Sequence, residues 1–502
     1  MTRIATYGAN QLYLSRITAL NERINKLTTQ VVTEKKSPNY TGIAEDSNRL
    51  INFENEKSRS EAFIKNNDSI QTTIGLANVS LTAVQTTMQT FRDRLDSFRT
   101  NKNRTQEDIE SIQNLAFQSM IDMQSYLSST ADGKYLFSGG LVSQEPVQLP
   151  AATRSGFTDI YDGFSVTYPT TRSAHMLDTV TKTATTGNLT FNAAAGTITA
   201  ANAGTLSDFP VGSRITASGA SASNNQTYTV VANTGTQIKV SRLTTEGPSA
   251  ATISYYNAGD ETHVQTLNAN LTFTPGTDTI QVSSTTGFSV GQVFSVAGTT
   301  SNDGSYKIQS ITPGPPNDSI TVESVKVGAT ETVAATLTAE SWYKGDNISI
   351  GQRIDQDRTV SVGVFASDPA FEKAFRAMGM IAQGQYGTAG GLENNLDRVE
   401  DALYLIRDAM LHPAGNQAPF GTEEASDLES VLSQLGTTQS LINTKTEKHK
   451  SYIGFLDDRI IAMENVDKNE AITLLLDDQR ALEAGYQTLS KVREMSLINF
   501  MK

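Results

Sequence analysis

The chain has 502 residues, a formal net charge of −13 and no cysteine. Its length allows two or three domains with their own cores. The acidic balance, without a dense basic cluster, argues against nucleic-acid binding, and the lack of cysteine excludes disulfides, thiolate metal sites and thiol nucleophiles. No stretch approaches the roughly 18 apolar residues of a membrane span, and residues 1–10 lack the features of a cleaved secretory signal. If the protein is extracellular, we expect export by a route that reads no cleaved signal.

The first apolar pattern predicts an amphipathic helix from about residue 10 to residue 32. Its apolar residues are spaced 4, 3, 4, 3 and 4 positions apart, which places them along one side of a helix. They are Tyr13, Ile17, Leu20, Ile24, Leu27 and Val31. Pro38 ends this helix or marks the loop after it. An apolar row of this kind requires a partner helix.

A longer pattern predicts a second helix over about residues 44–99, with a length on the order of 80 Å. Its apolar row keeps its register over Phe63–Phe98 and includes one polar member, Asn67. Asn67 either fixes the register of the helix or is a tolerated polar residue at a wet position. Residues Thr105–Asp108 resemble a capping box and open a third helix, which ends near Asp132-Gly133.

The C-terminal part mirrors this arrangement. Apolar rows predict helices over Leu392–Met410, Leu428–Met463 and about residues 470–496. The last helix carries leucines seven residues apart, and an apolar tip follows it. The leucines are Leu475, Leu482 and Leu489, and the tip includes Ile498 and Phe500.

Between about residues 139 and 368 the helical period disappears, and Thr, Ser and Gly dominate. Short alternating runs predict strands separated by turns. An internal repeat is present, because Leu189-Thr-Phe191 recurs as Leu271-Thr-Phe273 and Tyr228 recurs as Tyr306, roughly 80 residues further on. The repeat predicts two similar β modules in tandem, each with its own core.

These patterns predict an α+β fold: a long antiparallel helical coiled-coil core from both termini, with an inserted all-β region of two tandem modules. The N- and C-terminal helical regions are the expected polymerisation regions. The predicted divisions are an N-terminal helical region at 1–138, a β-rich connection at 139–183, a first β module at 184–258, a second β module at 259–341, a returning β segment at 342–368 and a C-terminal helical region at 369–502.

The sequence offers no catalytic, cofactor or metal site. The four histidines are isolated from one another and from any motif that binds a metal, and they are His175, His263, His412 and His449. Asp355-Gln-Asp357 and Asn302-Asp-Gly304 lack the rest of a calcium loop, and we expect both to be turns. His449 is either a pH switch or a partly exposed core histidine. We expect no enzyme activity.

In the order of its elements, the chain resembles the flagellin superfamily of bacterial flagella. The resemblance covers about residues 1–140 and 340–502 and includes Ala481-Leu-Glu-Ala-Gly-Tyr486 and Met495-Ser-Leu-Ile-Asn-Phe500. Two further segments look more like the hook-filament junction family, also called the third hook-associated protein. They are Asp132-Gly-Lys-Tyr-Leu-Phe-Ser-Gly-Gly140, and Tyr343-Lys-Gly-Asp346 with the following Ile348–Gly351 and Thr359–Val362.

The resemblance implies a structural subunit that joins hook to filament in a tubular assembly, with the β modules facing outward. It implies self-association, contact with other hook-associated proteins and flagellin, and export through the flagellar type III machinery with the help of an export chaperone. The location would be extracellular, in the flagellum, without membrane insertion. The two-module insert is larger than expected of a minimal junction protein, so a filament flagellin remains an alternative. A stalked adhesin or phage-tail-like fibre is a third interpretation.

The apolar rows at the two ends predict the assembly interface. Isolated helices of about 25 residues are marginal in water, so these rows need cover from another helix. The alternative is that the same rows form the core of a helical bundle within one chain. The predicted interface residues are Tyr13, Ile17, Leu20, Ile24, Leu27, Val31, Leu475, Leu482, Leu489, Ile498 and Phe500.

Overall fold

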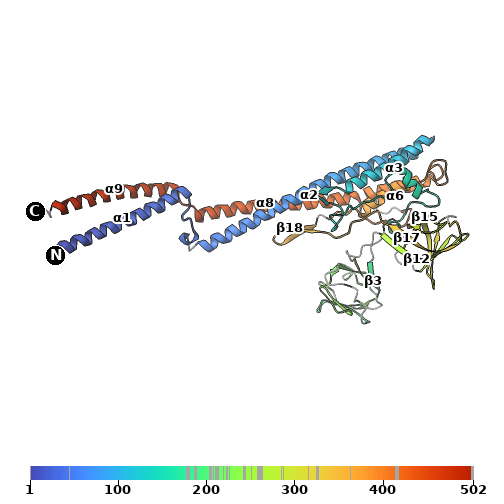
Figure 1. Ribbon diagram of the computed structural model, residues 1–502, viewed down its shortest axis with the longest axis horizontal. Coiled ribbons are helices and arrows are strands. Elements are labelled where there is room, and N and C mark those ends of the chain that lie inside the picture. Colours follow the sequence, from blue (N-terminus) through green and yellow to red (C-terminus); the bar gives the residue numbers. More distant parts are fainter. Residues whose placement is uncertain are drawn as a thin grey trace. The chain divides into compact units, whose positions relative to one another are not determined.

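The structure is a computed structural model (Figure 1). The residues that it describes are 2–43, 46–176, 181–185, 189–202, 206, 209, 214–218, 220–221, 224, 227–240, 243, 245–249, 252–256, 264–283, 285, 288–314, 316–323, 327–361, 363–412 and 418–498. The side chains of residues 2–10 and 493–498 are not among those described. The chain divides into two compact units: unit 1 comprises residues 1–71, 353–359 and 440–502, and unit 2 comprises residues 72–352 and 360–439.

Long helices occupy both ends of the chain, and the strands lie between them, which confirms the predicted fold class. The helices are α1 (Thr2–Thr33), α2 (Ser47–Thr100), α3 (Gln106–Leu127), α4 (Arg154–Ile160), α5 (Arg172–His175), α6 (Pro369–Ala382), α7 (Asp397–Met410), α8 (Leu428–Glu464) and α9 (Lys468–Ile498), with a 3-10 turn at Tyr40–Ile43. No helix in the described part of the chain is long and apolar enough to cross a membrane.

The strands fall into two larger β regions and two small hairpins. In chain order they are β1 (Thr130–Ala131), β2 (Lys134–Tyr135), β3 (Thr181–Thr185), β4 (Leu189–Asn192), β5 (Thr197–Ala200), β6 (Arg214–Ser218), β7 (Thr227–Thr229), β8 (Ala232–Asn233), β9 (Gln237–Lys239), β10 (Glu246–Ser249), β11 (Thr252–Tyr256), β12 (Val264–Thr274), β13 (Thr279–Val282), β14 (Val293–Ala297), β15 (Gly304–Thr312), β16 (Asp318–Val322), β17 (Glu331–Glu340), β18 (Gly351–Asp355) and β19 (Arg358–Ser361).

The helical part of unit 2 is built around two buried helix faces. The apolar row of α2 is fully buried, as predicted, at Ile74, Leu81, Val84, Met88 and Leu95. The predicted capping box of α3 is present, because the side chains of Thr105 and Asp108 each accept a hydrogen bond from the other's backbone N–H. Helix α6, which packs against α3 and α7, is buried along its whole length from residue 370 to residue 382. The sequence pattern did not single out this helix.

The first β region contains two antiparallel sheets, with strand orders β10-β4-β5-β9-β8 and β3-β11-β6-β7. The second region is a closed antiparallel barrel with the order β12-β13-β16-β15-β14-β17. Each region has its own cluster of buried apolar side chains, one with members from Leu189 to Val240 and the other from Leu271 to Ala339. Closure of the barrel removes the exposed strand edges on which other chains could pair.

The two β regions share a polar arrangement that supports the predicted internal repeat. In each, a buried tyrosine hydroxyl donates to the backbone carbonyl of the asparagine four residues earlier, and the amide of that asparagine donates to a glutamate. The bonds are Tyr228 to Asn224 at 3.0 Å and Asn224 to Glu246 at 2.7 Å in the first region, and Tyr306 to Asn302 at 2.8 Å and Asn302 to Glu331 at 2.9 Å in the second.

The segment expected to be a β-rich connection contains short helices instead. Helix α4 begins because the hydroxyl of Thr153 accepts a hydrogen bond from Gly156 N at 3.2 Å, which caps the helix. It then buries Phe157, whose ring contacts those of Phe117 and Tyr168. Between residues 139 and 176, the described β structure is limited to isolated bridging, as between Val147 and Tyr343. Capping and aromatic burial therefore outweigh the β propensity of this segment.

Candidate assembly surface

Helices α1 and α9 form an antiparallel pair within unit 1, which we call the terminal hairpin (residues 2–33 and 468–498). The two helices lie side by side, and α1 begins at the end where α9 finishes (Figure 1). Arg23 donates to the carboxylate of the buried Asp478, which lowers the pKa of Asp478. Ile17 lies next to Gly485, where a Cβ atom would be 3.7 Å from the isoleucine side chain. These contacts set the register between the two ends of the chain.

The base of the terminal hairpin is fastened by backbone hydrogen bonds. Lys36 N donates to Glu464 O at 2.7 Å, and Val466 N donates to Glu34 O at 3.0 Å. Lys468 Nζ lies 2.6 Å from the Glu34 carboxylate, and this hydrogen bond lowers the pKa of Glu34. The bonds join segments more than 400 residues apart in sequence, so the two ends of the chain enter the hairpin as one element.

The structure brings most of the predicted interface residues together within one chain. Ile17 and Leu27 are buried, Tyr13 remains 37% exposed, and the other described members are half-buried. The half-buried members are Leu20, Ile24, Val31, Leu475, Leu482 and Leu489. The side chain of Ile498, and Phe500 as a whole, lie outside the described residues. The two apolar rows therefore give each other partial cover within one chain.

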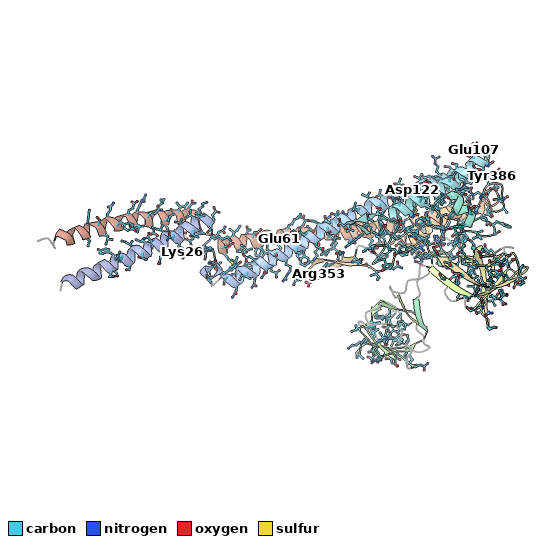
Figure 2. All side chains as sticks on the ribbon, viewed as in Figure 1. Lys26, Glu61, Glu107, Asp122, Arg353 and Tyr386 are labelled. Atoms are coloured by element: carbon cyan, nitrogen blue, oxygen red, sulfur yellow. The ribbon has the colours of Figure 1, made fainter. Side chains whose placement is uncertain are left out.

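A second set of apolar residues on the two helices stays exposed and was missed by the sequence pattern. These side chains, about half exposed, are Leu12, Leu14, Leu474, Leu476 and Tyr486. They flank the predicted rows, for example on either side of Tyr13, so a search for one apolar residue per turn passes over them. Full burial of each leucine would contribute roughly 1.5–3 kcal/mol. Charged side chains such as Lys26 share the exposed surface of the hairpin (Figure 2).

Elsewhere in unit 1, the turn between β18 and β19 is fastened to α2 and α8. Asn67, fully buried in the apolar row of α2, donates to Ile354 O at 3.3 Å and to Thr446 Oγ1 at 3.2 Å. The predicted turn at Asp355-Gln-Asp357 is confirmed, and the hydrogen bond from Lys445 to Asp355 lowers the pKa of that carboxyl group. Asn67 thus has a structural partner on each neighbouring segment.

His449 belongs to the same cluster. It is buried, its ring stacks on Phe63 with centroids 5.2 Å apart, and its Nε2 lies 3.3 Å from Ile354 O. A groove of about 300 Å³ adjoins it, lined by residues that include Glu56, Arg59 and Tyr452. The cluster packs and positions the turn.

In unit 2, the two segments that resemble the hook-filament junction family bind each other. Asp346 N donates to Ser138 O at 2.9 Å, and Gly140 N donates to the Asp346 carboxylate. Gly139 has a φ of 72°, and a Cβ atom there would overlap the Asp346 carbonyl, so only glycine fits. Tyr343 Oη donates to Asp346 O at 2.5 Å. Segments some 200 residues apart thus meet where the chain leaves and re-enters the helical core.

A buried ionic network surrounds α6 in unit 2. Glu372 and Arg376 are fully buried and form an ion pair at 2.8 Å, and Arg376 also contacts Glu423 at 2.6 Å. His175 Nδ1 lies 2.9 Å from Glu372 Oε1, and His175 Nε2 lies 2.8 Å from Tyr168 Oη. Burial raises the pKa of Glu372, but Arg376 and His175 outweigh it and lower this pKa to about 2.

This network has the residue types of a catalytic triad but the environment of a structural core. Both ring nitrogens of His175 already have partners, and burial lowers the pKa of the ring. The Glu372 charge is neutralised by Arg376. Among the described residues, no group of three histidine, aspartate or glutamate side chains is placed to hold a metal ion. We assign the network a packing role.

Comparisons with known proteins give matches to solved structures only. No protein-family model matches the chain, and no curated protein matches it. The FlgL structure from Xanthomonas campestris is 11% identical with a TM-score of 0.31, and the match covers 81% of this chain and 98% of that one. Flagellar hook associated protein-3 from Legionella pneumophila is 12% identical with a TM-score of 0.23, over 90% of this chain and 98% of that one.

A second Legionella pneumophila structure, the flagellar junction protein FlgL, is 11% identical with a TM-score of 0.21, over 82% of this chain and 98% of that chain. These proteins carry the name of the family that the sequence segments resemble. Because the identities and TM-scores are low, the function of this chain is inferred below from its own residues.

Proposed function

We propose that this chain is a structural, non-enzymatic subunit of the bacterial flagellum that joins the hook to the filament. The terminal hairpin carries the proposal. It combines one helix from each end of the chain, and its predicted rows cover each other in part. Apolar side chains also stay exposed on it, namely Leu12, Leu14, Leu474, Leu476 and Tyr486. Two helices cannot cover their own outer faces, so neighbouring copies cover them in a tubular assembly.

The placement at the hook-filament junction rests on two segments that resemble that family. Residues 132–140 and 343–346 carry the resemblance, and they bind each other through Ser138, Gly140 and Asp346. A segment that only happened to look similar would have no reason to meet its counterpart 200 residues away. This mutual contact supports the junction role over that of a filament flagellin.

The proposed location at the hook-filament junction implies the binding partners of this chain. They are further copies of this chain, other hook-associated proteins, flagellin and the flagellar type III export machinery with an export chaperone. The location is extracellular, in the flagellum, and the β regions form the outer surface. Nucleic acid and membrane are not among the proposed partners, in keeping with the net charge of −13.

A deletion strain tests the proposal. In the bacterium that encodes this chain, deletion of its gene should leave hooks intact, remove filaments and abolish motility, as seen by electron microscopy and swimming assays. Flagellin should then appear in the medium as unassembled protein. Antibody labelling of wild-type flagella should mark a short zone at the end of the hook.

Labelling along the whole filament, with hook-associated proteins retained in the deletion strain, would instead identify the chain as a filament flagellin. Normal filaments and motility in the deletion strain would refute both flagellar roles. Complementation with the intact gene is the control for effects on neighbouring genes.

A further inference from the structure

Helix α2 carries a second apolar row on the side opposite its buried one. From Ser69 to Thr90 this helix contains no charged residue, although Glu61, labelled in Figure 2, precedes the stretch and Arg92 follows it in the sequence. Within the stretch, positions 72, 76, 79, 83, 86 and 90 repeat at intervals of 4, 3, 4, 3 and 4. They hold Thr72, Leu76, Val79, Ala83, Thr86 and Thr90, which we call the outer row. A row with this period matches the seam of a coiled coil.

The outer row faces away from the packed core of unit 2. Val79 is 70% exposed and Leu76 is 43% exposed, whereas Ala77 and Leu81 on the buried row are at most 4% exposed. An ordinary exposed helix face carries charged side chains that keep it in water. Depletion of charge over roughly 27 Å of exposed helix is instead typical of the centre of a protein interface.

Three threonines of this part of α2 have their hydroxyl groups hydrogen-bonded within the helix. Thr86 Oγ1 donates to Thr82 O and Thr90 Oγ1 donates to Thr86 O, both at 2.9 Å, and Thr82 Oγ1 donates to Asn78 O at 2.8 Å. Because these donors are satisfied within the helix, burying them under a partner leaves no donor unpaired. The small side chains also let a second helix approach closely.

Unit 2 also carries a groove that suits such a row. Its volume is about 1100 Å³, and α2, α7 and α8 line it. Its apolar lining includes Leu403, Leu411 and Leu432. Most of the charged residues that line it are paired, as Arg407 is with Asp96 at 2.7 Å and Glu400 with Arg99 at 3.2 Å. Glu429 also lines the groove. An uncharged row brings no further charge into this groove.

We infer that the outer row of α2 in one copy packs into the α7–α8 groove of unit 2 in the next copy. This inference rests on the proposed function, and it names the surfaces by which neighbouring subunits meet. The groove is filled by a second copy of this chain, because each copy carries both the outer row and the groove. The contact therefore joins two different surfaces, one from each copy. A contact of this kind propagates from copy to copy and closes into a ring or continues as a helix, which is what a tube requires.

Site-specific crosslinking tests the contact, since the natural chain has no cysteine. A variant with Val79→Cys and Leu411→Cys is expressed in place of the natural chain. Isolated flagella, and the purified variant over a concentration series, are then treated with a short bismaleimide. We expect a ladder of dimers, trimers and larger species. Each single variant should stay monomeric, because the two patches differ. The control pairs Val79→Cys with Glu107→Cys on α3, outside both surfaces.

If the chain is present in isolated flagella but neither preparation gives a ladder, the inferred contact is refuted and the proposed function stands. A dimer from Val79→Cys alone would also refute it, because it would show a symmetric contact. A ladder from the purified variant, with the chain absent from flagella, would support the contact and refute the proposed function.

As a second measure, Val79→Glu should raise the concentration for half-maximal association at least ~10-fold, a change of about 1.4 kcal/mol. Gln118→Glu, at an exposed position of α3, should leave this concentration within about twofold.

Discussion

Asn67 is a single polar residue in the apolar row of α2, and its role depends on the atoms that its side chain contacts. From the sequence, Asn67 could have been a register device or a tolerated polar position. In the structure it is fully buried and its amide bridges Ile354 O and Thr446 Oγ1, so it ties α2 to α8 and to the β18–β19 turn. The neighbouring Asn66 makes one such bond, to Arg353 O at 2.7 Å, on a more exposed surface.

Replacing Asn67 should therefore cost more than replacing Asn66. We expect Asn67→Ala to lower the free energy of unfolding by about 1–3 kcal/mol, because it removes the two buried hydrogen bonds to Ile354 O and Thr446 Oγ1. Asn66→Ala, where water can replace the lost amide, should cost about 0.5 kcal/mol or less. Urea denaturation followed by circular dichroism measures both. Equal losses for the two variants would contradict the bridging role of Asn67.

At the scale of elements, the helical period predicted most of the helices but not their partners. The rows of α1, α2, α7, α8 and α9 were found because side chains on one face repeat every three or four residues whatever covers them. The helical period does not show whether the helix that covers an apolar row belongs to the same chain. In the structure, α9 covers part of the apolar row of α1. The exposed Leu474 and Leu476 were missed because they lie beside the row.

Helix α6 was missed for a different reason. Its Glu372, Lys373 and Arg376 are as charged as any surface residue, yet all three are fully buried. These residues form ion pairs with distant residues such as His175 and Asp408. The spacing of residues in the sequence does not indicate such long-range ion pairs. Sequence reasoning therefore found the apolar rows of the terminal hairpin but not the ionic core of unit 2.

The α6 network makes stability depend on pH. The pKa of Glu372 is about 2 in the folded chain, against 4.5 for an unperturbed glutamate. A carboxyl group with a lowered folded-state pKa stabilises above pH 4.5 and loses this contribution as the pH falls to about 2. Burial also lowers the pKa of His175, so below about 6.5 the unfolded chain takes up a proton that the folded one does not. Both effects make the free energy of unfolding fall on acidification.

We expect Glu372→Gln to destabilise unit 2 by about 3–5 kcal/mol at pH 7, because it breaks a buried ion pair. The difference from the natural chain should shrink as the pH falls from 4.5 towards 2. Fluorescence of Trp342, the only tryptophan, can follow unfolding here, since its ring stacks on His175 at 5.6 Å. Glu400→Gln, which removes a surface ion pair, should cost ~1 kcal/mol or less. A difference that persists at pH 2 would contradict the proposed charge pairing.

At the scale of the whole molecule, the surfaces proposed for assembly are helical. The outer row, the groove and the terminal hairpin involve α1, α2, α7, α8 and α9, and none of these surfaces includes a strand. The two β regions have separate cores, since the buried cluster of the first shares no member with that of the second. The first β region should therefore be dispensable for both the helical fold and the assembly.

Deletion of residues 184–258, with a flexible Gly/Ser linker in their place, tests this separation. The helical part should unfold at the same denaturant concentration as in the natural chain, because the first β cluster, among the described residues, is formed without any helical residue. Filaments should still form on hooks in cells that carry the deletion, as judged by electron microscopy. Deletion of α9 is the matched contrast: it strips Ile17 and Leu27 of their cover and should abolish filaments. Loss of filaments in the first variant, with unchanged helical unfolding, would place the first β region within the assembly contacts.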